Sequence, residues 1–179
     1  MSRPAAALVA LALAAAGALL AASPSRADLA PPPEPERFQV EDGVLKLPVP
    51  IAFEAGTAEL TPSSRRAVAH IARYLQIKEA VTTLRVEGHV AGEAKEAQAL
   101  SEKRALAVAK AVVAAGVDCG RLVAVGFGAT KPRTAGETPE ERALNTRVDA
   151  VMAALRGRPI GGMPIDGGGV VAGDVCPAK

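Results

Sequence analysis

The chain has 179 residues, of which 21 are basic and 19 acidic, and only 2% of its residues are aromatic. This near balance of charge, without a basic patch interleaved with aromatic residues, excludes a nucleic-acid partner. A core has to be built from Val, Leu, Ile and Ala, and the length allows one domain of ordinary size with tails.

The first 27 residues have the features of a secretory signal peptide. Arg3 precedes an apolar run over residues 5–22, and Ser25-Arg26-Ala27 places small residues at the two positions that signal peptidase recognises. We therefore expect residues 1–27 to be removed on export and no transmembrane span to remain. A retained anchor is the alternative, but no second basic cluster follows the run. The leader holds two arginines and no acid, so the mature chain has 19 basic and 19 acidic residues.

Residues 28–43 are predicted to form a proline-rich linker. They include the stiff, polar stretch "PPPEPER", which cannot bury a core. From Val44 to Phe53 apolar residues mostly alternate with others, which is the period of a strand with one buried face. Pro48 and Pro50 indicate that this first strand has an edge position or an irregular start.

Two helices and a second strand follow. Thr61-Pro62 supplies an N-cap and a proline at the first helical position, and apolar residues at helical spacing predict an amphipathic helix over residues 62–77. "TTLRVEG" (residues 82–88) alternates as a strand and ends in a turn. A buried stripe from Leu100 to Val112 predicts the second helix, which Gly116 stops.

The last third of the chain has shorter signals. "RLVAVGFG" (residues 121–128) predicts a third strand, and Thr138 with Glu141 forms a capping box that begins a short helix. Thr146–Leu155 fits a strand or a helix, and we prefer a strand for its first half. Residues 157–179 are rich in glycine, have no period, and are predicted to form a flexible C-terminal tail.

The order of these elements predicts a two-layer α/β sandwich. It is β-α-β-α-β-(short α)-β, so both long helices pack on one face of a mixed sheet. The predicted domain covers residues 44–156.

Cys119 and Cys176 are the two cysteines. Export to an oxidising compartment favours a disulfide between them, which would pin the tail to the domain. Two unpaired thiols are the alternative. Without a neighbouring histidine the pair does not indicate a metal site.

No catalytic residues are predicted. His70 and His89 are the two histidines, and neither lies in a recognisable nucleophile motif with a serine or cysteine and an acid. A phosphate-binding glycine loop is also missing. We therefore expect a protein that is not an enzyme and needs no cofactor or metal.

Four stretches, in the right order and at the right spacing, resemble the OmpA-like carboxy-terminal domain. They are "IAFEAGTAEL", "VEGH", "LSEKRALAVAKAVVAAGVDCGRLVAVGFG" and "ERALNTRVD". The resemblance covers about Val44 to Leu155. This family is the peptidoglycan-binding module of outer-membrane proteins, peptidoglycan-associated lipoproteins and flagellar stator proteins.

The resemblance implies a site for the zwitterionic end of a diaminopimelate peptide stem. The family uses an arginine for the ligand's carboxylate, in a position that Arg104 fills, and an acid for the ammonium in a Gly-His-Thr-Asp turn. In this chain Val90 and Ala91 replace the threonine and the acid, and Ala97 replaces an asparagine.

The closing motif is only partly kept. Asn145 and Arg147 match it, whereas Thr146 replaces a second arginine. Glu54 or Glu93 could supply the missing acid from another direction, or both are solvated charges. Arg104 could instead pair with Glu54 or another surface acid.

Two functions are left open. One is noncovalent binding to peptidoglycan, which anchors the envelope to the wall. The other is a periplasmic structural or protein-interaction module that has lost wall binding. Either places the protein in the periplasm, associated with the outer membrane or cell wall, with peptidoglycan or other envelope proteins as partners.

Overall fold

The computed structural model describes residues 37–177. The predicted signal peptide and most of the predicted linker lie outside this range. The strands are β1 (Val40–Glu41), β2 (Val44–Leu45), β3 (Val81–His89), β4 (Leu122–Gly126), β5 (Arg147–Leu155), β6 (Arg158–Pro159) and β7 (Val170–Val171). The α-helices are α1 (Arg65–Ile77), α2 (Ala94–Ala114) and α3 (Pro139–Asn145).

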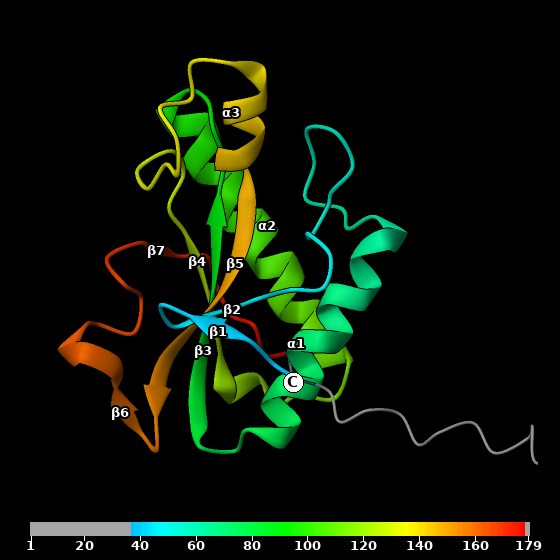
Figure 1. The fold of residues 1–179 in the computed structure, drawn as a ribbon, viewed down its shortest axis with the longest axis vertical. Helices are drawn as coiled ribbons and strands as arrows, with labels where there is room; N and C mark the ends of the chain where they lie inside the picture. The colour runs from blue at the N-terminus through cyan, green and yellow to red at the C-terminus, as the bar shows by residue number, and fades with distance from the viewer. Residues whose placement is uncertain (1–36, 178–179) are drawn as a thin grey trace, which may run out of the picture. The chain divides into compact units, whose positions relative to one another are not determined.

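The strands form one mixed sheet in the order β1-β2-β5-β3-β4-β7, with β6 also paired to β5. β3 and β4 are parallel, and the other pairs are antiparallel. Helices α1 and α2 lie on the same face of this sheet (Figure 1). The predicted two-layer α/β sandwich is confirmed.

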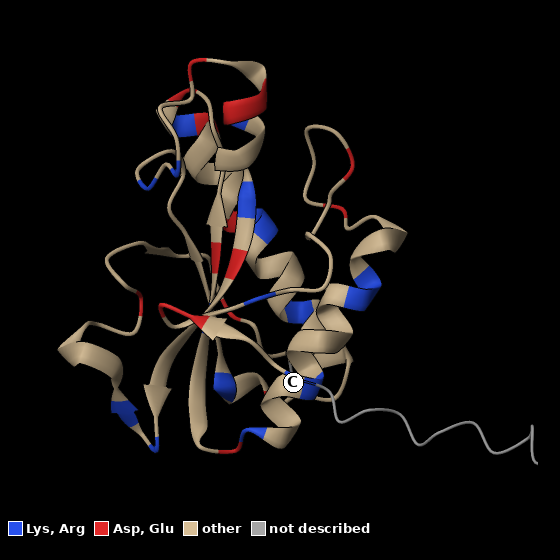
Figure 2. Ribbon diagram, viewed as in Figure 1, with Lys and Arg blue, Asp and Glu red and all other residues tan. Residues whose placement is uncertain are grey.

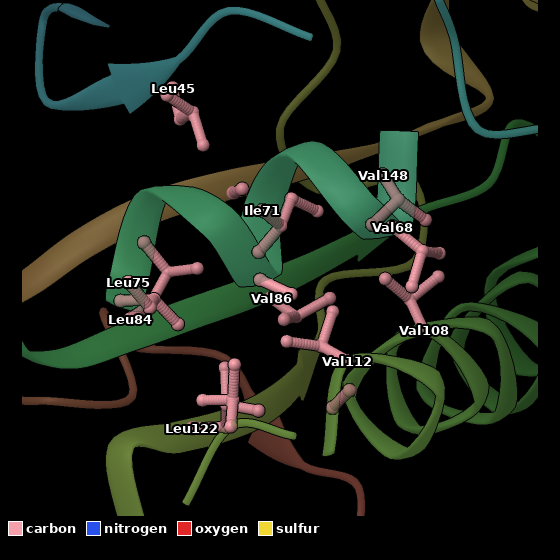
Figure 3. Packing of buried hydrophobic residues seen from close by; sticks show 14 of the residues in the cluster. Leu45, Val68, Ile71, Leu75, Leu84, Val86, Val108, Val112, Leu122 and Val148 are labelled. Carbon is pink, nitrogen blue, oxygen red and sulfur yellow. The ribbon is translucent and has the colours of Figure 1, made fainter. Parts of the chain in front are cut away.

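The core lies between the two long helices and the sheet. Ile71 and Leu75 of α1, Leu84 of β3, and Val108 and Val112 of α2 are completely buried. Figure 3 shows their side chains meeting in this layer. The apolar spacing used to predict the two helices therefore marks the buried face of α1 correctly. It marks that of α2 only in part, because Leu100, Ala107 and Ala111 are half-buried.

Of three local signals predicted for helix ends, two are confirmed and one is not. The capping box of α3 is confirmed, because Glu141 N donates to Thr138 Oγ1 over 3.2 Å and Thr138 N donates to Glu141 Oε2 over 3.3 Å. Gly116 ends α2 with a φ of +93°. Thr61, however, does not cap the first helix with its side chain, which donates to Ala52 O instead.

The first strand is much shorter than predicted. Only Val44–Leu45 pairs as a strand, and Phe53 forms an isolated bridge with Leu60. Pro48 and Pro50 provide the reason, since a proline has no N–H to donate to a ladder. In contrast, the segment before Val44 contains a strand that was not predicted, β1. Residues 147–155 form one strand, β5, although a strand was predicted only for the first half of Thr146–Leu155.

Residues 157–177 of the glycine-rich end pack on the domain, so the prediction of a flexible tail was wrong for them. We call residues 163–176 the C-terminal strap. Val171 of the strap pairs with Val125 of β4, and Val175 is buried in the core. The predicted disulfide between Cys119 and Cys176 is confirmed, and it fastens the end of the strap.

Two glycines let the strap lie directly on the sheet. A Cβ atom at Gly167 would come within 2.5 Å of Arg85 Cζ, and one at Gly169 within 2.4 Å of Val125 Cγ1. A segment with larger residues here could not approach the sheet so closely. Composition alone indicated disorder because it does not show what the glycines pack against.

Gly88 fixes the approach of α2 to β3. A Cβ atom at this position would lie 2.1 Å from Ser101 O in the α2 backbone. We expect Gly88→Ala to lower the free energy of unfolding by about 2 kcal/mol, because the helix has to move away from the strand. Urea denaturation measures the change. An unchanged midpoint would contradict this close contact.

Candidate functional site

Arg104 lies on α2 and points to the loop after the first predicted strand. Its Nε donates to Thr57 O over 2.8 Å, and its Cζ lies 4.7 Å from the centroid of the Phe53 ring. The residue is only 8% exposed. The loop carbonyl and the aromatic face together hold the guanidinium in one orientation.

This guanidinium faces a pocket of about 310 Å³. The pocket is lined by Ile51, Ala52, Phe53, Arg104, Ala143, Thr146 and Arg147. Within residues 37–177, Arg104 Nη1 and Nη2 make no hydrogen bond. Burial lowers the pKa of Arg104 below its usual value, but an arginine remains charged at neutral pH. The pocket therefore contains a fixed cation with free donors.

Asn145 and Arg147 both brace the loop before α3. Asn145 Oδ1 accepts hydrogen bonds from the backbone N–H groups of Arg133 (2.7 Å) and Thr134 (3.0 Å). Arg147 Nε donates to Asp149 Oδ2 over 2.8 Å, and its Nη2 donates to Lys131 O over 3.3 Å. Arg147 lines the Arg104 pocket, but its donors are engaged by the protein.

The two candidate acids are not ion-paired with Arg104. Glu54 is exposed in the loop that carries Thr57, and Glu93 is exposed at the start of α2. Neither carboxylate forms an ion pair in the described part of the chain. Arg104 bonds to the Thr57 carbonyl rather than to Glu54, the partner considered from the sequence.

The turn after β3 supplies no acid to the pocket. Val90 is buried, and its N–H donates to Gly128 O over 3.0 Å. Ala91 is half-buried and its N–H donates to Thr146 Oγ1 over 3.2 Å. Ala91 lines a neighbouring pocket of about 210 Å³. Thr146 thus links this turn to the wall of the Arg104 pocket.

The sequence did not reveal a charged cluster that lies on the face of the sheet opposite α1 and α2. Arg85 Nε donates to Glu87 Oε1 over 2.6 Å, and His89 Nε2 lies 3.4 Å from Glu87 Oε2 and 3.7 Å from Asp149 Oδ2. Figure 2 shows these acidic positions on β3 and β5 side by side. Arg85, Glu87 and His89 alternate with Leu84 and Val86. This period of two could have indicated that the three polar residues share the face of β3 opposite the core.

Burial and neighbouring charges act in opposite directions on Glu87. Burial alone would raise its pKa, but the His89 ring and the Arg85 guanidinium outweigh burial, so the pKa lies below its usual value. Arg85 Nη1 also donates to Ile165 O of the C-terminal strap over 2.9 Å. The cluster therefore joins β3 to the strap and belongs to the fold rather than to the Arg104 pocket.

Every helix in residues 37–177 is too short or too polar to cross a bilayer. Nor does the range contain three or more His, Cys, Asp or Glu side chains placed to hold a metal ion.

Comparison with curated proteins finds relatives in bacterial envelopes. Outer membrane porin F of Pseudomonas aeruginosa is 32% identical over 114 residues, which are 62% of this chain and 32% of the porin. The probable lipoprotein YiaD of Escherichia coli is 29% identical over 114 residues, which are 63% of this chain and 52% of YiaD. The chain thus spans about a third to a half of the length of these relatives.

Solved structures show the same fold. A MotB-like protein from Desulfovibrio vulgaris is 26% identical with a TM-score of 0.56, over 64% of this chain and 78% of that one. The peptidoglycan-associated lipoprotein from Burkholderia pseudomallei is 27% identical with a TM-score of 0.51, over 59% of this chain and 89% of that one.

A family model agrees with both comparisons. The OmpA family matches residues 52–146, which include the Phe53 loop, Arg104 and the closing Asn145. This match covers more than half of the chain, and it contains five of the seven residues that line the pocket. The chain therefore belongs to the OmpA family.

Proposed function

We propose that this chain is an exported envelope protein that binds peptidoglycan noncovalently and thereby anchors the envelope to the wall. The ligand is the diaminopimelate residue of a peptide stem, and Arg104 holds its carboxylate. The observation that carries this proposal is a buried guanidinium with two unbonded donor groups facing a pocket of about 310 Å³.

The geometry of Arg104 suits a carboxylate. Because Nε is bonded to Thr57 O, the edge formed by Nη1 and Nη2 remains available for a two-point hydrogen bond. The low exposure of Arg104 strengthens such a bond, since little water competes with it. Ile51 and Phe53 offer apolar surface to the aliphatic part of a diaminopimelate side chain.

The ligand's ammonium has no charged partner at Ala91. Thr146 can offer its hydroxyl oxygen, but a neutral acceptor gives a weaker hydrogen bond than a carboxylate. Loss of one charged partner typically costs a few kcal/mol, equivalent to about a hundredfold in affinity. We therefore expect binding to be weaker than a domain with the acid would show.

The comparisons support a role in binding. The name of the Burkholderia lipoprotein states that it is peptidoglycan-associated, and the named relatives are envelope proteins. We assign no catalytic reaction to the chain and place it in the periplasm.

One set of observations favours a second function. Val90, Ala91 and Ala97 occupy positions where the family has a hydroxyl, an acid and an amide, and Ala97 is buried. A protein-interaction module in the periplasm is consistent with these replacements. We infer this second function if the chain does not bind peptidoglycan.

Cosedimentation with isolated peptidoglycan sacculi tests the proposal. The purified chain is expected to pellet with sacculi, and a soluble diaminopimelate-containing stem peptide is expected to displace it. Protein that stays in the supernatant at every sacculus concentration would reject wall binding and leave the interaction module.

Restoring the acid provides a gain-of-function prediction. Ala91→Asp is expected to raise the affinity for the stem peptide about tenfold, because a carboxylate beside Thr146 would pair with the ammonium. Titration calorimetry measures the change, and Ala91→Asn is the neutral control. Equal affinities of the two variants would mean that a carboxylate at residue 91 does not contact the ligand's ammonium.

A further inference from the structure

A second groove runs beside β5. β2 pairs with β5 only at Val44 and Val151, and the chain then separates from β5. The space between them is about 340 Å³ and is lined by Val44, Leu45, Lys46, Leu47, Val49, Pro50, Ile51, Arg133, Thr146, Arg147, Val148 and Asp149. Its volume lies at the lower end of the usual range for ligand pockets.

Among the described residues, the edge of β5 beside this groove has no strand partner at Val148, which lines the groove and is 6% exposed. Met152 N donates to Gly43 O over 2.8 Å, which shows that Met152 presents its polar groups to the β2 side. In a strand alternate residues share an edge, so Val148 presents its N–H and C=O to the same side. No strand in residues 37–177 pairs with Val148 there. The groove can therefore hold an extended peptide by backbone hydrogen bonds.

Arg133 supplies an accessible cation at the groove. Its side chain is 54% exposed, and Nη2 donates to Asp149 Oδ1 over 2.8 Å. Arg147 bonds to the other oxygen of the same carboxylate, so two guanidinium groups share one aspartate and one positive charge is in excess. The Asn145 side chain fixes the backbone N–H of Arg133. Arg133 is therefore oriented, and its Nε and Nη1 bond to no described residue.

The groove and the Arg104 pocket adjoin each other. Ile51, Thr146 and Arg147 line both. These shared residues place Arg104 and Arg133 at the linings of two neighbouring cavities. Arg104 is the buried cation of the two and Arg133 is the exposed one.

We propose that the groove is a second subsite for the same peptide stem, where Arg133 binds a second carboxylate while the peptide backbone lies along Val148. This proposal rests on the proposed function and extends its ligand from one residue to a stem with two carboxylates. A second ionic contact, separate from that of Arg104, offsets part of the affinity lost with the acid at Ala91.

A thermodynamic cycle on the full chain tests the coupling. The ligands are a stem peptide with a free glutamate carboxylate and the same peptide with that carboxylate amidated. The test variant is Arg133→Gln. Arg158→Gln on distant β6 is the control that removes the same charge. Titration calorimetry gives the affinities. Thermal unfolding establishes that each variant is folded. Both substitutions are at exposed side chains, so we expect the variants to fold.

In the wild type and in Arg158→Gln, amidation is expected to weaken binding about tenfold. In Arg133→Gln, the free-carboxylate peptide is expected to bind as weakly as the amidated one. If amidation still weakens binding tenfold in Arg133→Gln, the second subsite is wrong while the Arg104 site stands. If neither peptide binds the wild type, both the subsite and the proposed function are rejected.

Discussion

Exchanging Cys119 and Cys176 for serine is expected to lower the free energy of unfolding by about 4 kcal/mol. The two cysteines are 57 residues apart, and a crosslink over such a long loop removes much conformational entropy from the unfolded chain. The disulfide also fastens the strap, whose β7 pairs with β4 and whose Val175 is buried in the core.

Urea denaturation of the oxidised wild type, the reduced wild type and the double serine variant measures this effect. Reduced wild type and variant are expected to unfold at the same midpoint, since both lack only the crosslink. A loss below about 1 kcal/mol would mean that the noncovalent contacts of the strap are sufficient. In that case the long loop contributes little constraint to the unfolded state.

Replacing Arg104 with alanine is expected to lower the affinity for sacculi about a hundredfold. The substitution removes the buried cation and both donors that face the pocket, and a charge-assisted hydrogen bond pair of this kind contributes a few kcal/mol. Cosedimentation at a series of sacculus concentrations measures the change.

Two controls separate binding from folding. Arg158→Ala removes the same charge from an exposed position on β6 and is expected to leave binding unchanged. Arg104→Lys keeps the charge but loses the planar two-donor edge, so it is expected to recover only part of the affinity. Wild-type affinity in a folded Arg104→Ala variant would show that the pocket is not used.

The helices could be predicted from the sequence because their signals are local. The period of apolar residues indicated the buried face of α1 and part of that of α2, and the Thr138 capping box indicated the start of α3. The first strand was overestimated for a physical reason that the sequence also contains. Pro48 and Pro50 outweigh the alternation of apolar residues around them.

The C-terminal strap could not be predicted because its determinants are distant in sequence. Gly167 and Gly169 are required where the strap lies against Arg85 and Val125, more than 40 residues earlier. Glycine-rich composition without a period is equally typical of disorder. Only the cysteine pair indicated that this segment is held to the domain.

The candidate site could be predicted in part. Motif spacing identified Arg104, but its contacts with Thr57 and Phe53 depend on how α2 packs against a loop far away in the chain. The sequence gives no sign of the role proposed for Arg133, because that role depends on its contact with Asp149 and on the groove beside β5. Side chains that act through tertiary contacts are not marked by local pattern.

A crystal structure of the chain with a diaminopimelate stem peptide tests the central claim most directly. The expected result is a ligand carboxylate within about 2.9 Å of both Nη1 and Nη2 of Arg104, between Phe53 and Thr146. A peptide bound away from this pocket, with Arg104 still bonded only to Thr57 O, would contradict the proposed site.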